Sequence, residues 1–179
     1  MDTTDELLAL AAAGGDRSAF SALLSRHYDR IFGLAYRLTG QQAEAEDLTQ
    51  DICAALPAKL GGFRGDAKFT TWLYRVTVNA AHDRRRRMAT QMKAREGWGE
   101  WEINRQADAA ESAEAADWLQ TAMRSLSPEL RETVALILGE ELTQKEAAAV
   151  LDVSEGTIAW RMSEVKKRLK AILEQEASA

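Results

Sequence analysis

Hydrophobic residues recur every three or four positions along most of the chain, which is the period of amphipathic helices. The alternating pattern typical of strands does not occur. Three helices are predicted in the first half of the chain, over residues 16–40, 43–59 and 69–87. Asp16 is suited to cap the first of these and Gly40 to end it. The predicted buried face of the third consists of Phe69, Leu73, Val76 and Ala80.

The apolar period fails between residues 88 and 113, where Gly97, Gly99 and a run of acidic residues occur. Such a stretch is longer than an ordinary connection between helices, so it predicts a linker. We therefore expect an all-α fold of two small helical domains joined by an acidic, flexible linker. The expected boundaries are 1–90 for the first domain, 91–113 for the linker and 114–179 for the second domain.

The second half of the chain shows the pattern of a helix-turn-helix. Helices are predicted over residues 118–126, 128–139, 144–151 and 154–172. Thr143 and Glu146 form a capping-box pattern, and Ser154 is suited to cap the last helix after a tight turn at Asp152. A short helix, a tight turn and a longer helix are typical of a motif whose second helix enters the DNA major groove. An ordinary helical hairpin is the alternative interpretation.

Charge is strongly segregated along this chain of 179 residues, whose net charge is -5. Residues 59–95 hold 10 basic and 2 acidic side chains, whereas residues 96–118 hold 1 basic and 7 acidic side chains. A basic segment inside an acidic chain favours one face for a polyanion and another for a protein partner. A solvated basic helix end is the simpler alternative.

Other function classes receive little support from the composition. One cysteine and two histidines predict no disulfide, no metal site and no cofactor. Neither a nucleophile with a base nor a phosphate-binding loop is present, so we do not expect an enzyme. The first residues are acidic and no apolar stretch approaches the length of a membrane span. We therefore expect a cytoplasmic protein with no membrane contact of its own.

Within the basic segment, six side chains spaced three or four positions apart share one stripe of the predicted helix. They are Lys68, Trp72, Arg75, Asn79, His82 and Arg86, and we expect them to lie opposite the buried face. Cations that hold phosphates, an aromatic ring that stacks and an amide that reads a base edge suit the recognition of unpaired DNA. For Trp72 a place in the core is an equally good interpretation, and His82 is expected to be solvated rather than catalytic.

These residues resemble the extracytoplasmic-function (ECF) group of bacterial RNA polymerase sigma factors. The run EDLTQD at 46–51 is similar to the family's core-polymerase-binding helix, and FRGD at 63–66 with FTTWLYR at 69–75 is similar to its promoter-melting segment. LSP at 126–128, EAA at 146–148 and GTI at 156–158 are similar to its second, promoter-reading domain. The resemblance implies a transcription initiation factor whose partners are core RNA polymerase, promoter DNA and an anti-sigma factor.

The resemblance also implies roles for individual residues. Core polymerase would contact Asp47, Gln50 and Asp51. The minus-ten element would be recognised and melted by Arg64, Lys68, Trp72, Arg75, Asn79, Arg84, Arg85, Arg86 and Arg87. The minus-35 element would be read by Ser154, Thr157, Trp160, Arg161 and Lys167.

The chain departs from the family pattern in the predicted recognition helix. The family commonly has basic residues after the GTI motif, where this chain has Ala159, Trp160 and, further on, Glu164. Trp160 lies about 200° around the helix from Ile158, so we expect its side chain to be exposed and to contact either DNA or a protein partner. Trp98 and Trp101 receive no role. The alternative function is a stand-alone helix-turn-helix regulator with an N-terminal dimerisation or sensor module.

Overall fold

The computed structural model describes residues 3–96 and 114–177, and all regular elements within these ranges are helical. In chain order they are α1 (Asp5–Ala13), α2 (Arg17–Thr39), α3 (Gln42–Lys59), η1 (Leu60–Gly62), α4 (Phe69–Glu96), α5 (Glu114–Ser125), α6 (Pro128–Val134), η2 (Ala135–Gly139), α7 (Gln144–Leu151) and α8 (Glu155–Ala177). The predicted all-α fold is confirmed. None of the described helices is long and apolar enough to cross a membrane.

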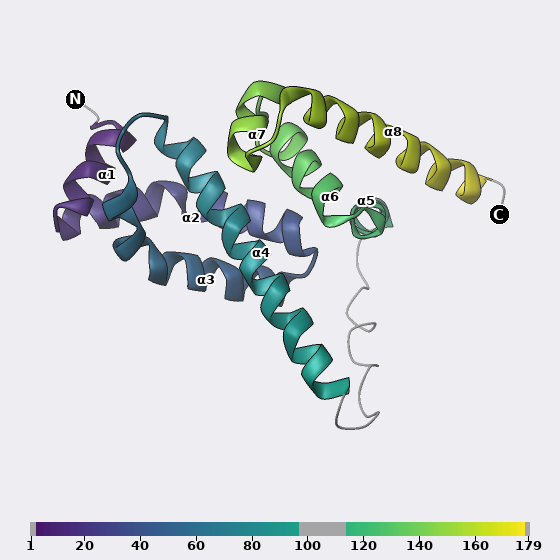
Figure 1. The fold of residues 1–179 in the computed structure, drawn as a ribbon, viewed down its shortest axis with the longest axis horizontal. Helices are drawn as coiled ribbons and strands as arrows, with labels where there is room; N and C mark the ends of the chain where they lie inside the picture. Colours follow the sequence, from purple (N-terminus) through teal and green to yellow (C-terminus); the bar gives the residue numbers. More distant parts are fainter. Residues whose placement is uncertain (1–2, 97–113, 178–179) are drawn as a thin grey trace.

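Helices α1 to α4 form the first helical unit, which lies on the left in Figure 1. The limits of α2 follow the sequence signals, because Asp16 accepts hydrogen bonds from the backbone N–H groups of Ser18 and Ala19, and Gly40 ends the helix at φ 72°. Large apolar side chains from α2, α3 and α4 form the core of this unit. The most deeply buried include Ile31, Leu48, Ile52, Phe69 and Leu73.

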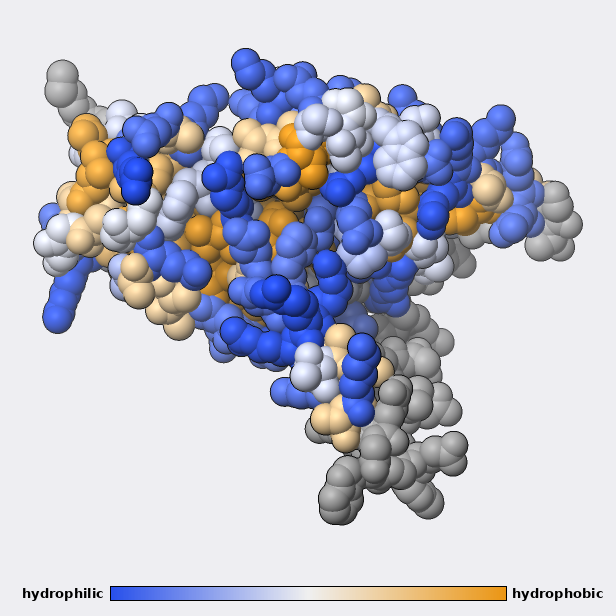
Figure 2. Space-filling model, viewed as in Figure 1, coloured by the Kyte–Doolittle hydropathy of each residue, from blue (hydrophilic) through white to orange (hydrophobic). Residues whose placement is uncertain are grey.

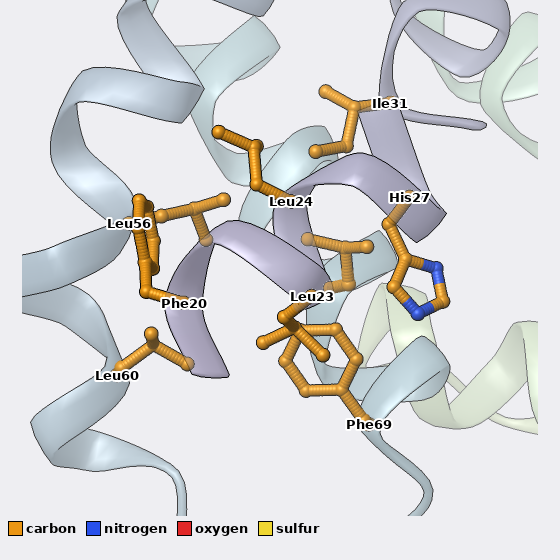
Figure 3. Close-up of a pocket in the computed structure, with 9 residues that line it drawn as sticks. Phe20, Leu23, Leu24, His27, Ile31, Leu56, Leu60 and Phe69 are labelled. Atoms are coloured by element: carbon orange, nitrogen blue, oxygen red, sulfur yellow. The ribbon is translucent and has the colours of Figure 1, made fainter. Parts of the chain in front are cut away.

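Helix α1 was not predicted, although it buries Leu8 and Ala9 in the core of the first unit. Its stretch of leucines and alanines has no polar side that would mark a helical period. A usable signal did exist, because Thr4 caps the helix and Asp5 begins it, which is a common helix start. Asp5 lies 2.7 Å from Nε2 of the buried His27, whose ring packs beside Phe69 (Figure 3).

Helix α4 differs from its prediction in length and in the number of its buried sides. It continues past Arg87 to Glu96, so its last turns lie inside the stretch expected to be a linker. The prediction that the DNA-binding stripe lies opposite the buried face is wrong, because a second buried side with Tyr74 and Val78 occupies that position. Tyr74 and Val78 are four residues apart and lie on the side of α4 away from Phe69.

Helices α5 to α8 form the second helical unit, which contains the predicted helix-turn-helix at α7 and α8. Thr143 and Glu146 make the expected capping box at the start of α7. Asp152 takes the left-handed conformation at φ 54° in the turn, and Ser154 accepts a hydrogen bond from the Thr157 N–H at the start of α8. The helix expected over 128–139 is divided into α6 and the π-helical turn η2.

The two units share a hydrophobic core, an arrangement that we call closed. Leu34, Leu38, Tyr74 and Val78 of the first unit pack with apolar residues of the second, among them Leu136. Figure 1 shows α7 beside the N-terminal half of α4, whereas the C-terminal half of α4 and the far end of α8 project outward. The remainder of the expected linker, with Trp98 and Trp101, lies outside the described residues.

We expect α1 to stabilise the start of α4 through Glu6, whose carboxylate accepts a hydrogen bond of 3.1 Å from the Phe69 N–H. This bond lowers the pKa of Glu6 below its ordinary value of 4.5, so its stabilising effect is complete above that pH and is lost as the pH falls through the lowered pKa. Replacing Glu6 by Ala should reduce the free energy of unfolding by about 1 kcal/mol at pH 7. Urea unfolding at pH 7 and below pH 4 measures this difference, which should shrink in acid.

The matched control for this prediction is Glu46→Ala, which removes an exposed carboxylate from α3. Its effect should stay within about 0.5 kcal/mol at both pH values. A Glu6→Ala protein as stable as its parent at pH 7 would show that the bond to Phe69 contributes nothing.

Candidate nucleic-acid interface

The exposed side of α4 presents an amide and several arginines. Asn79, Arg86 and Arg87 are exposed, and Arg86 pairs with Asp83 one turn earlier on the same helix. Arg64 is also exposed, in the loop that precedes α4. Hydrophilic side chains gather along α4 in the middle of the face that Figure 2 shows. This part of the predicted minus-ten surface is open to a ligand.

Trp72 is half-buried and belongs to an aromatic cluster at the start of α4. Its ring centroid lies 5.6 Å from that of Phe63 and 5.6 Å from that of Phe69. Both neighbours are buried in the core of the first unit, and ring pairs at this separation stabilise packing. The structure therefore places Trp72 at the edge of the core, with part of its ring still accessible.

Two cations of the predicted stripe contact α7 of the second unit. Lys68 Nζ lies 3.7 Å from Oε1 of Glu146, and Arg75 donates a hydrogen bond to the backbone carbonyl of Ala149. A cation that pairs with a carboxylate or carbonyl must leave it before it can bind a phosphate in the same geometry. The closed arrangement thus occupies part of the stripe.

A buried carboxylate on α6 engages two further basic side chains of α4. Oε1 of Glu132, whose side chain is 6% exposed, lies 2.5 Å from His82 Nε2 and 3.5 Å from Arg85 Nη1. His82 was expected to be solvated, and the structure leaves 38% of its side chain exposed while the rest contacts Glu132. The partner is fifty residues away in sequence, so helical spacing alone gave no sign of it.

Arg84 points to α3 rather than to the stripe. Its guanidinium lies 3.4 Å from Glu44, 3.2 Å from Asp47 and 3.5 Å from Asp51. The structure therefore joins a residue predicted to bind DNA to two of the residues predicted to bind core polymerase. Gln50 is exposed beside them, and Asp47 and Asp51 have side-chain exposures of 65% and 64%.

A second buried carboxylate, Glu140, was not found from the sequence. It follows η2 and is 8% exposed. One oxygen accepts a hydrogen bond of 2.6 Å from Arg37, and the other accepts one of 2.8 Å from the Tyr74 hydroxyl. Arg30 lies 3.7 Å from the same carboxylate. Burial and the hydrogen bond to Glu140 raise the pKa of Tyr74, so its hydroxyl keeps its proton and remains a donor.

The predicted minus-35 residues lie on the first four turns of α8 and just before them. Ser154 and Thr157 are joined by a hydrogen bond of 2.9 Å, Arg161 is half-buried, and Lys167 pairs with Glu164 at 2.9 Å. Trp160 is 62% exposed while Ile158 is fully buried. The prediction that Trp160 points away from the core is confirmed.

The described residues contain no group of three His, Cys, Asp or Glu side chains that could hold a metal ion. Their chemistry is that of a binding surface: exposed cations and an amide on α4, exposed carboxylates on α3, and an exposed aromatic ring on α8.

Two family models match the chain, and together they cover most of it. Residues 23–90 match sigma-70 region 2, and residues 116–169 match sigma-70 region 4. The ECF RNA polymerase sigma factor SigM of Mycobacterium tuberculosis is 34% identical over 173 residues, which cover 96% of this chain and 86% of that protein. The ECF RNA polymerase sigma-E factor of Escherichia coli is 28% identical over 177 residues, covering 93% and 92% of the two chains.

Solved structures show the same fold. The structure of CnrH in complex with the cytosolic domain of CnrY matches with a TM-score of 0.69 at 28% identity, and the match covers 97% of this chain and 99% of that one. Helix α1 lies before the segment that matches region 2.

We expect Trp160 to contribute little to folding, because most of its side chain is exposed. Trp160→Ala should change the free energy of unfolding by less than about 0.5 kcal/mol. Ile158→Ala, two residues away on the buried side of the same helix, should cost about 2–5 kcal/mol. Urea unfolding of the two variants makes the comparison, and a large loss for Trp160→Ala would mean that its ring supports the core.

Proposed function

The chain belongs to the ECF sigma factors of RNA polymerase, and on this premise we propose which of its surfaces bind the polymerase and the promoter. The protein is a transcription initiation factor that binds core RNA polymerase and directs it to promoters. One observation supports the assignment of surfaces: a helix with exposed carboxylates, a helix with an exposed amide and arginines, and a helix-turn-helix follow one another in one chain, in the family's order.

The exposed edge of α3 is the proposed contact with core polymerase. Asp47, Gln50 and Asp51 lie on the solvent side of this helix, opposite the buried Leu48 and Ile52. Carboxylates at the rim of an interface steer association with a basic partner. Arg84 lies within 3.5 Å of both aspartates, and we propose that it orders their side chains before the polymerase binds.

The exposed side of α4 is the proposed minus-ten surface. Asn79 is the amide that can read a base edge, because its side chain is exposed in the middle of the stripe. Arg64, Arg86 and Arg87 are accessible cations for the phosphate backbone. Lys68, Arg75 and Arg85 belong to the same surface but are engaged by the second unit in the closed arrangement. Melting is driven by binding to the opened strand, with no catalytic residue.

Helix α8 is the proposed minus-35 reader, with Ser154, Thr157, Arg161 and Lys167 near the duplex. Trp160 can pack on a thymine methyl group or a sugar but cannot neutralise a phosphate. We infer that the minus-35 contact is weak and depends little on salt, and that α4 supplies most of the affinity for DNA. The alternative function, a stand-alone helix-turn-helix regulator, does not explain why residues 23–90 match sigma-70 region 2.

An anti-sigma factor is a further partner. The related structure of CnrH contains the cytosolic domain of CnrY, and this chain shares its fold over 97% of its length. We propose that this protein works in the cytoplasm, where the polymerase and the chromosome are, and that Trp160 is either a DNA contact or an anchor for this partner.

Run-off transcription with purified core polymerase on a promoter library tests the proposed function and the core-binding surface together. The parent protein should support transcription from a subset of promoters. The Asp47→Lys, Gln50→Ala double variant should bind core polymerase at least about tenfold more weakly and lose transcription, because it reverses one charge and removes one hydrogen-bonding group of the edge.

The control for this experiment is Asp29→Lys, which makes the same charge reversal at an exposed position of α2. It should retain core binding. Equal affinity of the double variant and the control would reject α3 as the contact with the polymerase, and specific binding of duplex promoter DNA by the free parent protein would favour the stand-alone regulator.

Replacement of Asn79 or Arg86 by Ala should impair promoter binding in different ways. Asn79→Ala should lower discrimination at one minus-ten base by about 1–3 kcal/mol, because an amide that contacts a base edge carries sequence information. Arg86→Ala should weaken binding to all promoter variants alike and reduce the salt dependence, because a guanidinium on the backbone contacts phosphate. Holoenzyme binding to single-base promoter variants at two salt concentrations separates the two. A uniform loss for Asn79→Ala would contradict base reading.

A further inference from the structure

We propose that Arg30, Arg37 and Tyr74 form a carboxylate-binding socket on the first unit, that Glu140 of the second unit is its ligand, and that occupancy of the socket restricts access of DNA to the minus-ten surface. The proposal rests on the proposed function for the identity of that surface. The socket itself depends only on the contacts between the two units.

The socket has the geometry of a specific site rather than of a surface ion pair. Arg37 and Tyr74 each donate to a different oxygen of Glu140, at 2.6 and 2.8 Å, and Arg30 adds a second positive charge at 3.7 Å. The carboxylate is almost fully buried, and a buried charge is stable only when it is paired and hydrogen-bonded. The socket provides both conditions.

The backbone next to Glu140 is shaped for the same contact. Gly139 lies directly under the Arg37 side chain, where a Cβ atom would come within 2.7 Å of Arg37 Cδ and Nε. Real Cβ atoms do not approach other atoms so closely, so a side chain at this position would displace Arg37. Because Gly139 has no side chain, the Arg37 guanidinium can pass over the backbone there and reach the carboxylate of Glu140.

Occupancy of the socket fixes the second unit over part of the minus-ten surface. Tyr74 lies on α4, one residue before Arg75, and Arg75 donates to the backbone of α7. On the same side, Lys68 and Arg85 pair with Glu146 and Glu132 of the second unit. Three cations proposed for DNA are therefore engaged when Glu140 is in the socket.

The closed arrangement also cannot reach both promoter elements at once. Elements centred about 25 base pairs apart are separated by roughly 85 Å of duplex. In the closed arrangement α7 touches α4, and the 23 residues of α8 extend only about 35 Å. The units must separate before α4 and α8 bind their two elements, and separation requires Glu140 to leave the socket.

The test is the affinity of the full-length free protein for a labelled single-stranded oligo(dT), which reports access to the cations of α4 without requiring a promoter sequence. If DNA binds only the open form, a variant that weakens closure raises the fraction of open molecules. The affinity for DNA then rises in the same proportion, even while most molecules remain closed. Glu140→Gln should therefore bind at least about tenfold more tightly at low salt. Glu141→Gln removes the same charge from the neighbouring exposed residue and should change affinity less than twofold.

Two further variants exclude simpler explanations. Tyr74→Phe keeps the buried ring and the net charge but removes the hydroxyl that donates to Glu140, so it should also tighten binding. Arg37→Gln combined with Glu140→Gln should add little to Glu140→Gln alone, because both changes break the same contact.

Equal effects of Glu140→Gln and Glu141→Gln, or unchanged binding in Tyr74→Phe, would overturn the proposal. Run-off transcription with core polymerase is measured in parallel. A parent protein that supports no transcription would reject the proposed function, whereas the oligo(dT) result would still decide whether the socket exists.

Discussion

The second buried side of α4 is the feature on which the arrangement of this protein depends. Phe69 and Leu73 pack against α2 and α3 in the usual way, but Tyr74 and Val78 on another side of the helix are covered by the second unit. Leu34 and Leu38 of α2 are covered in the same way. Full burial of a large apolar side chain stabilises a protein by about 1.5–3 kcal/mol, and the part of this burial that the second unit provides favours the closed arrangement. The polar contacts around these side chains align the two units and stabilise the closed arrangement further.

Those polar contacts explain why the charge segregation of the sequence does not leave a fully free basic face. Glu132, Glu140 and Glu146 of the second unit each approach basic side chains of the first. A guanidinium that already pairs with a carboxylate can bind a phosphate only by exchange of one anion for another. The net gain from DNA at such positions is therefore smaller than at Arg87, which is exposed. The closed arrangement divides the predicted minus-ten surface into occupied and accessible cations.

The sequence predicted the local features well because their signals are local. The caps at Asp16, Thr143 and Ser154, the tight turn at Asp152 and the exposed Trp160 depend on neighbours a few residues away. Helix α1 was missed because nine mostly apolar residues have no polar face to set a period. The contacts of Arg37 with Glu140 and of His82 with Glu132 join residues 103 and 50 positions apart, and no spacing along one helix reveals them. The apolar spacing of Tyr74 and Val78 was the one usable signal that α4 has a second partner.

The chemistry of the socket limits what can open it. Arginine side chains keep their charge in proteins, and burial with the hydrogen bond to Glu140 raises the pKa of Tyr74, so the phenol stays protonated further into the alkaline range than a free tyrosine. The donors that face Glu140 therefore do not change charge near neutral pH. A change in the protonation of these donors therefore does not release Glu140 near neutral pH, whereas a surface that competes for the second unit or for the apolar side of α4 would favour the open form. The proposed contact of core polymerase on α3 is exposed in the closed arrangement, so it can form before the units separate.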